Sequence, residues 1–214
     1  YTVTFDPNGG NDPSAASKSV TYDGAYGELS TVSREGYIFA GWSTSLSGDV
    51  MILSETIVSI SQDHTLYALW SAGTDTAYIV EHYKQDVTGP GYTLADTDDL
   101  FGTTGETATA QAKVYTGFIE NGSHTDRTAS GTITGDGSLV LKLYYDRENC
   151  TVTYDANLAD SGTAPVDINS PYRYDAAVTM LDNSDLVKAG KAFDGWNTQA
   201  DGNGTDHAAL DVLS

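Results

Sequence analysis

The side chains best suited to chemistry in this sequence are clustered oxygen ligands. Two short runs carry them, Asp96–Asp99 (Asp-Thr-Asp-Asp) and Asp201–Asp206 (Asp-Gly-Asn-Gly-Thr-Asp). Carboxylate and amide oxygens at short spacing are typical of calcium loops, yet neither run has the glycine at position six and the glutamate at position twelve of an EF-hand loop. Solvated turns rich in Asp and Asn are the competing interpretation. We therefore expect no bound cofactor, with calcium as the alternative.

The residues that catalysis would need do not form a catalytic motif. The sequence contains no Gly-x-Ser-x-Gly, no His-Glu-x-x-His, no Cys-x-x-Cys and no phosphate-binding glycine loop with a lysine. Glu81 and His82 would point to opposite faces of one strand, so their adjacency does not make them a catalytic pair. The histidines are scattered along the chain at His64, His82, His124 and His207. We expect no catalytic and no metal-ligating residues, and hence a protein that is not an enzyme.

Aromatic side chains are the remaining candidates for a binding site. The sequence holds 14 tyrosines and 3 tryptophans, and aromatic rings with a polar tip can stack on a sugar. Tyr92, Tyr115 and Phe118 are the three that we would assign to such a platform. Most of the aromatics alternate within strand patterns, however, which is where core residues belong. Core packing is therefore the competing interpretation for each ring.

The charge balance limits the class of partner. The formal net charge is −20, with only 10 Lys and Arg side chains against 30 Asp and Glu, and the acidity is spread along the chain. Nucleic acid and anionic membranes are poor partners for such a surface, because phosphates must be neutralised by clustered Lys and Arg. No apolar run approaches the roughly 20 residues of a membrane span. The chain also starts directly in a strand pattern, which favours a fragment of a longer protein.

An internal repeat organises the sequence. The stretch Gly36–Trp42 (Gly-Tyr-Ile-Phe-Ala-Gly-Trp) returns as Gly190–Trp196 (Gly-Lys-Ala-Phe-Asp-Gly-Trp). Upstream of each copy, Thr2–Asn8 matches Thr151–Asn157, and a Tyr-Asp pair follows in both. The same order of landmarks in both copies indicates related modules rather than chance matches.

This pattern resembles the Listeria–Bacteroides repeat, the B-repeat of internalin-type surface proteins. The resemblance covers roughly residues 1–70 and 149–214. It implies a β-grasp, ubiquitin-like fold in which the last strand of a module lies beside the first. The first module ends with Thr65–Trp70, which is apolar on both faces and therefore predicts a strand in the middle of a sheet.

The residues between the two copies resemble a different family. They open with Tyr78–Tyr83 (Tyr-Ile-Val-Glu-His-Tyr), carry Gly117-Phe118 in the interior and close with Leu141–Tyr145 (Leu-Lys-Leu-Tyr-Tyr). These features are similar to the mucin-binding-protein (MucBP-like) repeats of bacterial surface proteins, which also imply a β-grasp. We therefore expect three modules, at 1–70, 71–148 and 149–214.

The expected fold class is α+β and mostly β, with three small modules in an elongated array. The alternation of Thr2–Asp6 predicts a strand that buries Val3 and Phe5, and Thr151–Asp155 should form its counterpart. One short helical turn is expected within Tyr26–Ser33. Tyr37, Phe39 and Trp42 should dominate the first core. The third module has no equivalent of Thr65–Trp70, so we expect an open edge beside Thr151–Asp155 and strand-mediated self-association through it.

The predicted function is a non-catalytic stalk or adhesin segment of a bacterial surface protein. It would be extracellular, space or present a binding head, and make weak contacts with a host or matrix protein or glycan. Neither nucleic acid nor membrane insertion is expected for these residues. One alternative is a carbohydrate- or mucin-binding module centred on 71–148. Another is an accessory region of a larger secreted enzyme.

Overall fold

The computed structural model describes residues 1–213, and every regular element in this part of the chain is a β-strand. The mostly-β prediction is confirmed, and no helix is observed in the described residues. The chain divides into two compact units. Unit 1 comprises Tyr1–Glu81, Asp96–Gln111 and Asp126–Leu143, and unit 2 comprises His82–Ala95, Ala112–Thr125 and Tyr144–Ser214.

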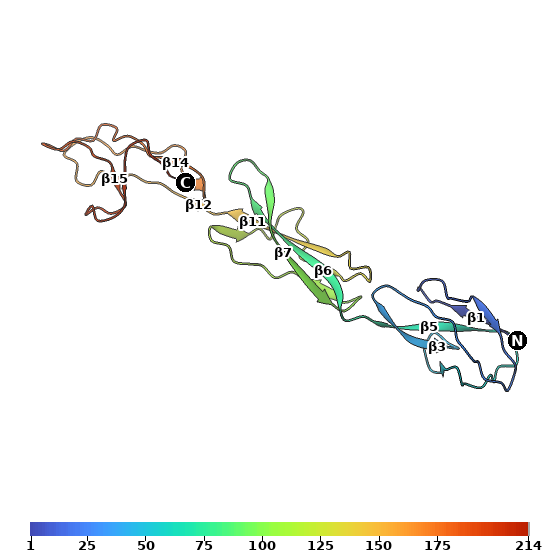
Figure 1. Ribbon diagram of the computed structural model, residues 1–214. Helices are drawn as coiled ribbons and strands as arrows, with labels where there is room; N and C mark the ends of the chain where they lie inside the picture. Colours follow the sequence, from blue (N-terminus) through green and yellow to red (C-terminus); the bar gives the residue numbers. More distant parts are fainter. Residues whose placement is uncertain (214) are drawn as a thin grey trace. The chain divides into compact units, whose positions relative to one another are not determined.

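The strands, several of which are labelled in Figure 1, are β1 (Thr2–Asp6), β2 (Ser17–Ser19), β3 (Tyr37–Ser43), β4 (Met51–Ile52), β5 (His64–Ala72), β6 (Thr76–Gln85), β7 (Tyr92–Gly102), β8 (Thr107–Thr109), β9 (Phe118–Glu120), β10 (Ser130–Thr132), β11 (Val140–Arg147), β12 (Asn149–Cys150), β13 (Tyr172–Arg173), β14 (Val178–Thr179), β15 (Trp196–Asn197), β16 (Asp206–His207) and β17 (Val212–Leu213). Within residues 1–213 there is no helix with the length and hydropathy of a membrane span.

The N-terminal sheet has the order β2-β1-β5-β3-β4. Its central strand, β5, pairs in parallel with β1, from Val3↔His64 to Asp6↔Tyr67. On the other side β5 pairs antiparallel with β3, where the register shifts between Phe39 and Gly41. The two apolar faces of β5 thus occupy the middle of the sheet, as predicted, and the last strand lies beside the first.

The core of this sheet is built from alternating residues. Val3 and Phe5 are 0% and 3% exposed, as the period of two in β1 predicts. Trp42 is 1% exposed and is the largest fully buried side chain. The prediction that Tyr37 and Phe39 share this role is wrong, because Tyr37 is only half-buried, with the Arg34 guanidinium over its ring, and Phe39 is exposed.

The helical turn expected within Tyr26–Ser33 is absent from the structure. The Ser30 carbonyl accepts a 2.8 Å hydrogen bond from Trp42 Nε1, and the Ser30 hydroxyl donates 2.9 Å to the Ala15 carbonyl. The Ser14 amide donates to the Thr31 carbonyl, and the Thr31 amide donates to the Ser14 hydroxyl, both at 2.9 Å. Serine hydroxyls compete in this way with helical hydrogen bonding, so the segment stays extended.

The middle of the chain forms a four-stranded sheet, β7-β6-β11-β9, and a two-stranded sheet, β10-β8. In unit 1 its core consists of Val80, Ala108, Ile133 and Leu141. The long strand pattern that the sequence shows after Asp136-Gly137 corresponds to β11, and Gly137 takes the positive φ that the turn requires.

The C-terminal residues form three two-stranded sheets, β12-β13, β14-β17 and β15-β16. The expected strand at Thr151–Asp155 is not formed, and only Asn149–Cys150 just before it pairs, with β13. The matching residues Thr2–Asp6 are held between β2 and β5. Without a neighbour equivalent to β5 in residues 149–213, alternation alone does not make Thr151–Asp155 a strand.

Candidate functional site

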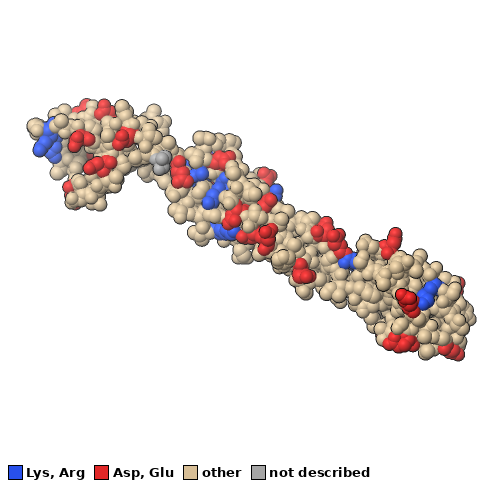
Figure 2. Space-filling model, in the orientation of Figure 1, with Lys and Arg blue, Asp and Glu red and all other residues tan. Residues whose placement is uncertain are grey.

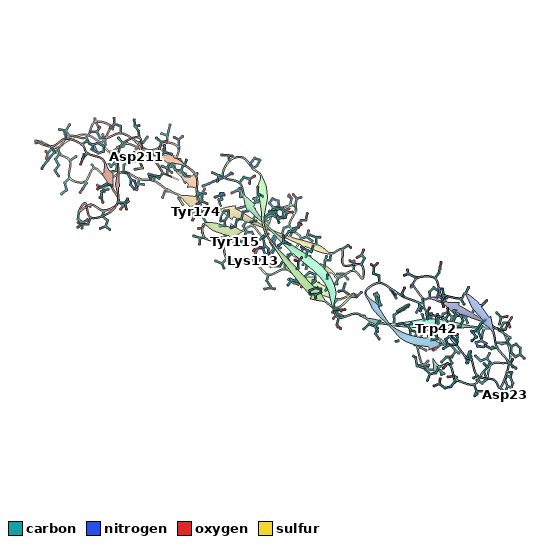
Figure 3. The ribbon with its side chains drawn as sticks, in the orientation of Figure 1. Asp23, Trp42, Lys113, Tyr115, Tyr174 and Asp211 are labelled. Atoms are coloured by element: carbon teal, nitrogen blue, oxygen red, sulfur yellow. The ribbon has the colours of Figure 1, made fainter. Side chains whose placement is uncertain are left out.

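Two aromatic corners of the same geometry occur far apart in the sequence. In the first, the ring centroids of Phe5 and Trp42 are 4.8 Å apart at an interplanar angle of 60°. In the second, those of Tyr154 and Trp196 are 4.7 Å apart at 59°. Each indole Nε1 donates a 2.8 Å hydrogen bond to a backbone carbonyl in the segment that precedes it. The chain therefore builds the same packing once in each unit, and Figure 3 marks Trp42 in the first.

The turns beside these corners are copied as well. The backbone amide of Asn8 donates to the Asp6 carboxylate at 2.8 Å, and that of Asn157 donates to Asp155 at 2.7 Å. Both asparagines have a left-handed backbone, with φ of 46° and 41°. Asparagine tolerates this conformation better than most residues with a side chain. The same residue types thus hold the same local backbone in both copies.

A comparison with protein families accounts for these copies. The Listeria-Bacteroides repeat domain matches residues 1–69 and 151–211, which is more than half of the chain. The chain belongs to the Listeria-Bacteroides repeat family. Residues 1–69 are the first repeat, residues 151–211 are the second repeat, and residues 70–150, outside the match, are the central segment. The prediction of two related modules at the ends of the chain is confirmed.

Two curated relatives come from Evansella cellulosilytica. One is named "Putative membrane protein" and is 28% identical over 211 residues, which are 95% of this chain and 29% of the relative. The other is named "Putative Gly-rich membrane protein" and is 30% identical over 114 residues, which are 53% of this chain and 11% of the relative. The chain spans less than a third of the length of either relative.

The first repeat meets the central segment through a pair of glycines in unit 1. Gly36, at a φ of +72°, lies so close to Gly135 that a Cβ on Gly36 would be 2.3 Å from the Gly135 Cα. The Gly36 carbonyl accepts a 2.9 Å bond from the amide of Gly73, whose own carbonyl accepts a 2.9 Å bond from the amide of Thr104. Only glycine permits this approach of two backbones.

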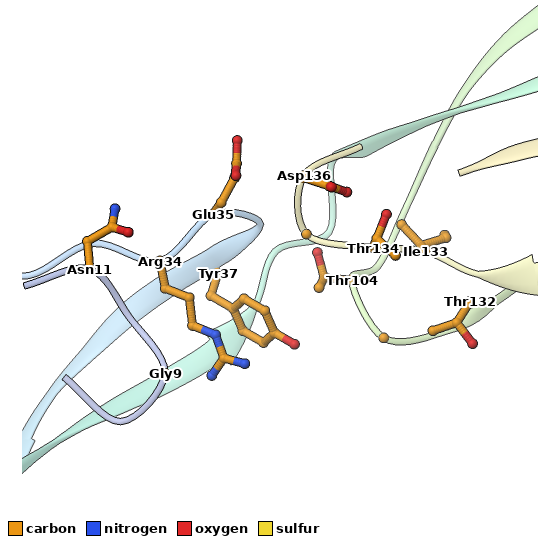
Figure 4. A pocket seen from close by; sticks show the side chains of 12 residues that line it. Gly9, Asn11, Arg34, Glu35, Tyr37, Thr104, Thr132, Ile133, Thr134 and Asp136 are labelled. Atoms are coloured by element: carbon orange, nitrogen blue, oxygen red, sulfur yellow. The ribbon is translucent and has the colours of Figure 1, made fainter. Parts of the chain in front are cut away.

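An open polar pocket of about 510 Å³ adjoins this glycine pair. Arg34 and Tyr37 lie alongside each other on one side of it, with the guanidinium 3.9 Å from the ring centroid (Figure 4). On the other side, hydrogen bonds from the Thr134 and Ser138 hydroxyls lower the pKa of Asp136. The lining residues offer both hydrogen-bond donors and hydrogen-bond acceptors, as a polar contact surface would.

The second repeat meets the central segment through two arginines in unit 2. Arg147 on β11 donates from Nε to the Gln85 carbonyl and from Nη1 to the Tyr174 carbonyl, both at 2.7 Å. Arg173 of the second repeat donates to backbone carbonyls of the turn between β6 and β7. Charged donors to carbonyls form stronger bonds than neutral pairs. The bonds from Arg147 to Tyr174 and from Arg173 to the turn join the two segments directly.

Tyr115 and Phe118, two of the three predicted platform residues, share one cation. Lys84 Nζ lies 3.8 Å from the Tyr115 ring centroid and 5.0 Å from that of Phe118. The Arg147 guanidinium lies 4.8 Å from the Phe118 ring, and the Tyr174 ring contacts Phe118 edge-on at 6.1 Å. Figure 3 labels Tyr115 and, close to it, Lys113. Both rings therefore take part in contacts within unit 2.

Tyr92, the third predicted residue, belongs to a different cluster. Its ring lies 4.7 Å from His124 and 5.3 Å from Tyr144, and its hydroxyl donates to the Asp146 carboxylate. Desolvation, followed by the bond to Asp146, raises the pKa of Tyr92. Tyr115 instead contacts Tyr145, the neighbour of Tyr144 on β11. Adjacent strand residues point to opposite faces, so the three predicted residues do not form one platform.

The acidic runs are engaged in local turn bonds. The backbone and side-chain amides of Asn203 each donate to Asp201 at 3.0 Å and lower its pKa. Asp96 accepts from the amide of Thr97 at 2.9 Å. Across residues 1–213 no group of three or more His, Cys, Asp or Glu side chains is placed to hold a metal ion. Acidic side chains are spread over the face shown in Figure 2 rather than gathered at one point.

Sequence analysis missed the role of the basic residues. Lys84, Arg147 and Arg173 organise the contacts of unit 2, although the chain has only 10 Lys and Arg in all. The alternation of Lys84 with His82 and of Arg147 with Tyr145 places them on the aromatic face.

Proposed function

We propose that this chain is a non-catalytic spacer segment of an extracellular bacterial surface protein, which holds a binding head away from the cell. Membership of the Listeria-Bacteroides repeat family and the membrane-protein names of its relatives support a surface-associated repeat protein. The observation that carries the spacer role is the direct contact of each repeat with the central segment. A spacer transmits force or maintains a fixed separation only when its neighbouring parts are held against each other.

The modular organisation behind this function is 1–70, 71–148 and 149–214, each a β-grasp module, with a MucBP-like module in the middle. The parallel pairing of β1 with β5 at the centre of the first sheet supports the β-grasp assignment. The central segment has its own four-stranded sheet and its own core, which supports a module that differs from the repeats.

Ligand binding is the competing role of the central segment, and the packing of its rings favours the spacer. Tyr115 and Phe118 present faces to Lys84 and Arg147, and Phe118 also meets Tyr174. A sugar would have to displace these partners before it could stack. Weak contacts with a host or matrix protein or glycan remain part of the proposal, as a property of many repeats acting together.

The spacer role is tested by the rotational motion of the second repeat, measured by ¹⁵N NMR relaxation on the intact chain. We expect the second repeat to tumble with the β9–β11 part of the central segment. Arg147→Ala removes the bonds to Gln85 and Tyr174 and should make the second repeat tumble faster. Lys188→Ala, at an exposed position of the second repeat, is the matched control. Independent tumbling in the unmodified chain would contradict a spacer.

A glycan and mucin array with the same chain separates the two roles. We expect no selective binding with or without calcium. Selective binding that is lost in Tyr115→Ala, while the relaxation of the second repeat is unchanged, would establish the carbohydrate-binding alternative. Calcium-dependent binding would in addition assign an ion to one of the two acidic runs.

A further inference from the structure

The pocket beside the contact of Gly36 with Gly135 holds hydrogen-bond donors that the protein itself does not use. All of its lining residues belong to unit 1. The Arg34 guanidinium lies over the Tyr37 ring, and across residues 1–213 it donates no hydrogen bond and forms no ion pair. The Tyr37 hydroxyl makes no hydrogen bond within the same residues. Two polar groups of the first repeat are therefore left for a ligand.

The guanidinium is held in place, which lowers the entropy lost when a ligand binds to it. Its distance of 3.9 Å from the Tyr37 ring centroid places it in contact with the ring face. The backbone of Gly9 passes close to it, since a Cβ on Gly9 would lie 3.5 Å from Arg34 Cζ. Figure 4 shows this arrangement, with the Tyr37 hydroxyl directed across the gap towards Thr104. A planar guanidinium restrained in this way offers parallel N–H donors to a carboxylate.

The opposite wall, in the central segment, offers acceptors. Asp136 lines the pocket and accepts from the amide and the hydroxyl of Ser138, at 3.1 and 2.8 Å. Hydrogen bonds from Thr134 and Ser138 lower the pKa of Asp136, so it is ionised at neutral pH. A carboxylate has about four acceptor positions, which leaves Asp136 able to accept from a ligand as well. A ligand suited to both walls carries an anionic group and, beside it, an N–H donor.

The charges around the pocket favour a carboxylate over a phosphate. Glu35 and Asp136 both line it, whereas Arg34 is the one cation among its lining residues in the described part of the chain. Coulomb repulsion grows in proportion to charge, so a phosphate dianion would be repelled about twice as strongly as a carboxylate. Stacking of a sugar is also disfavoured, because the guanidinium covers one face of the Tyr37 ring.

We propose that this pocket, which we call the joint pocket, binds a carboxylate of a polypeptide together with the backbone N–H beside it. The carboxylate lies against Arg34 and the Tyr37 hydroxyl, and the N–H donates to Asp136. A chain end and an acidic side chain both present this pair of groups. The site goes beyond the spacer role, and a ligand that touches both walls would also hold the first repeat against the central segment.

The test is an NMR titration of the 214-residue chain with short peptides. Acetyl-Ala-Ala-Ala with a free carboxylate presents a chain end, and acetyl-Ala-Asp-Ala amide presents a side chain. We expect saturable shifts of the Arg34 Nε–H and of the Gly105 and Gly135 amides with at least one of them, and the stronger binder identifies the source. Acetyl-Ala-Ala-Ala amide, which lacks the carboxylate, should bind at least about 10-fold more weakly. Acetate, which lacks the N–H, should also bind at least about 5-fold more weakly.

Three variants locate the site. Arg34→Gln should abolish binding, while Lys191→Gln removes one positive charge at an exposed position of the second repeat and should leave binding within about twofold. Tyr37→Phe keeps the ring under the guanidinium, removes the hydroxyl and should weaken binding about 2- to 10-fold. This variant also tests the site if Arg34→Gln unfolds the first repeat.

A second measurement tests whether the ligand joins the two walls. At a peptide concentration of about ten times the dissociation constant, a ligand that must leave before the walls separate slows that opening equilibrium about 10-fold. Hydrogen exchange of the Thr104 amide, which donates to the Gly73 carbonyl at the joint, should slow by the same factor.

Three outcomes would overturn the proposal. One is the absence of saturable shifts with both carboxylate peptides in a folded chain. Another is equal binding of the amide peptide that lacks a carboxylate. The third is tighter binding of inorganic phosphate or glucuronate than of either peptide, since the ligand would then belong to another class. None of these outcomes bears on the spacer role, which is measured on the second repeat in unit 2.

Discussion

Replacement of Gly36 by alanine has two possible costs in stability, the strain of a positive φ and the steric clash of the new Cβ. Gly36 has a φ of +72°, and its counterpart in the second repeat, Gly190, has a φ of +71°. A Cβ on Gly36 would lie 2.3 Å from the Gly135 Cα and 2.7 Å from the Gly135 carbonyl oxygen, whereas a Cβ on Gly190 would meet nothing within 4 Å. Gly190→Ala is therefore a matched control that shares the backbone strain and lacks the contact.

The magnitudes follow from these geometries. A left-handed conformation costs a residue with a Cβ about 1–2 kcal/mol, and the lower entropy of the unfolded alanine chain offsets about 0.4–1 kcal/mol of this in both variants. Forcing a methyl group into a packed contact costs about 1–3 kcal/mol more. Gly36→Ala should pay this second cost by opening the contact between the first repeat and the central segment, because the neighbouring atoms are backbone and cannot turn aside.

The assay is amide hydrogen exchange at Thr104, whose amide donates a 2.9 Å bond to the Gly73 carbonyl next to the contact. A cost of about 1–3 kcal/mol predicts exchange about 5- to 150-fold faster in Gly36→Ala than in the unmodified chain. Gly190→Ala should leave Thr104 unchanged. Equal protection of Thr104 in both variants would refute the close approach of the two glycines, and with it the observation that supports a fixed joint in unit 1.

Three further changes test other parts of the structure. Leu66→Ala should lower the free energy of unfolding of the first repeat by about 3–5 kcal/mol, because Leu66 is 0% exposed. Urea unfolding followed by tryptophan fluorescence measures this change. Leu46→Ala, at an exposed position, should change the free energy of unfolding by less than about 0.5 kcal/mol. Burial raises the pKa of Tyr26, so the folded state keeps this proton above pH 10 while the unfolded state loses it. Stability should therefore be complete below about pH 10 and fall as the pH rises through the raised pKa, and Tyr26→Phe should remove that part of the slope. Gly117→Ala would place a Cβ 2.2 Å from the Tyr174 ring and should release the second repeat in the relaxation experiment, whereas Gly105→Ala, which also has a positive φ but meets nothing within 4 Å, should not.

Local sequence patterns predicted the parts of the fold that depend on short-range alternation. The period of two in Thr2–Asp6 gave the buried faces of Val3 and Phe5, and the two apolar faces of Thr65–Trp70 gave a central strand. Both follow from the pleat of a strand, because successive side chains point to opposite faces and burial of one face fixes the register. The repeated landmarks also gave the family, because they preserve order as well as residue type.

The features that failed depend on partners distant in sequence. The residues around Tyr26–Ser33 do not indicate that Trp42 Nε1 donates a hydrogen bond to the Ser30 carbonyl. This bond helps to hold the segment extended. The grouping of the three predicted aromatic residues also depends on distant partners. Tyr115 and Phe118 come together because Lys84, on another strand, reaches both rings, whereas Tyr92 is drawn to Asp146 on the other face.

The second repeat shows how far a motif alone determines structure. The turn of the first repeat recurs at Asn157, its ring angle recurs between Tyr154 and Trp196, and its backbone conformation recurs at Gly195. No strand equivalent to β5 lies between these residues in the second repeat. These features are therefore set locally, by turn bonds and by one tryptophan hydrogen bond. Extended pairing is not local, since Thr151–Asp155 has the alternation of β1 and forms no strand, and residues 149–213 contain no segment that pairs with it as β5 pairs with β1. The motif sets the local turns and ring contacts, whereas the sheet of the first repeat forms through the pairing of β5 with β1 and β3.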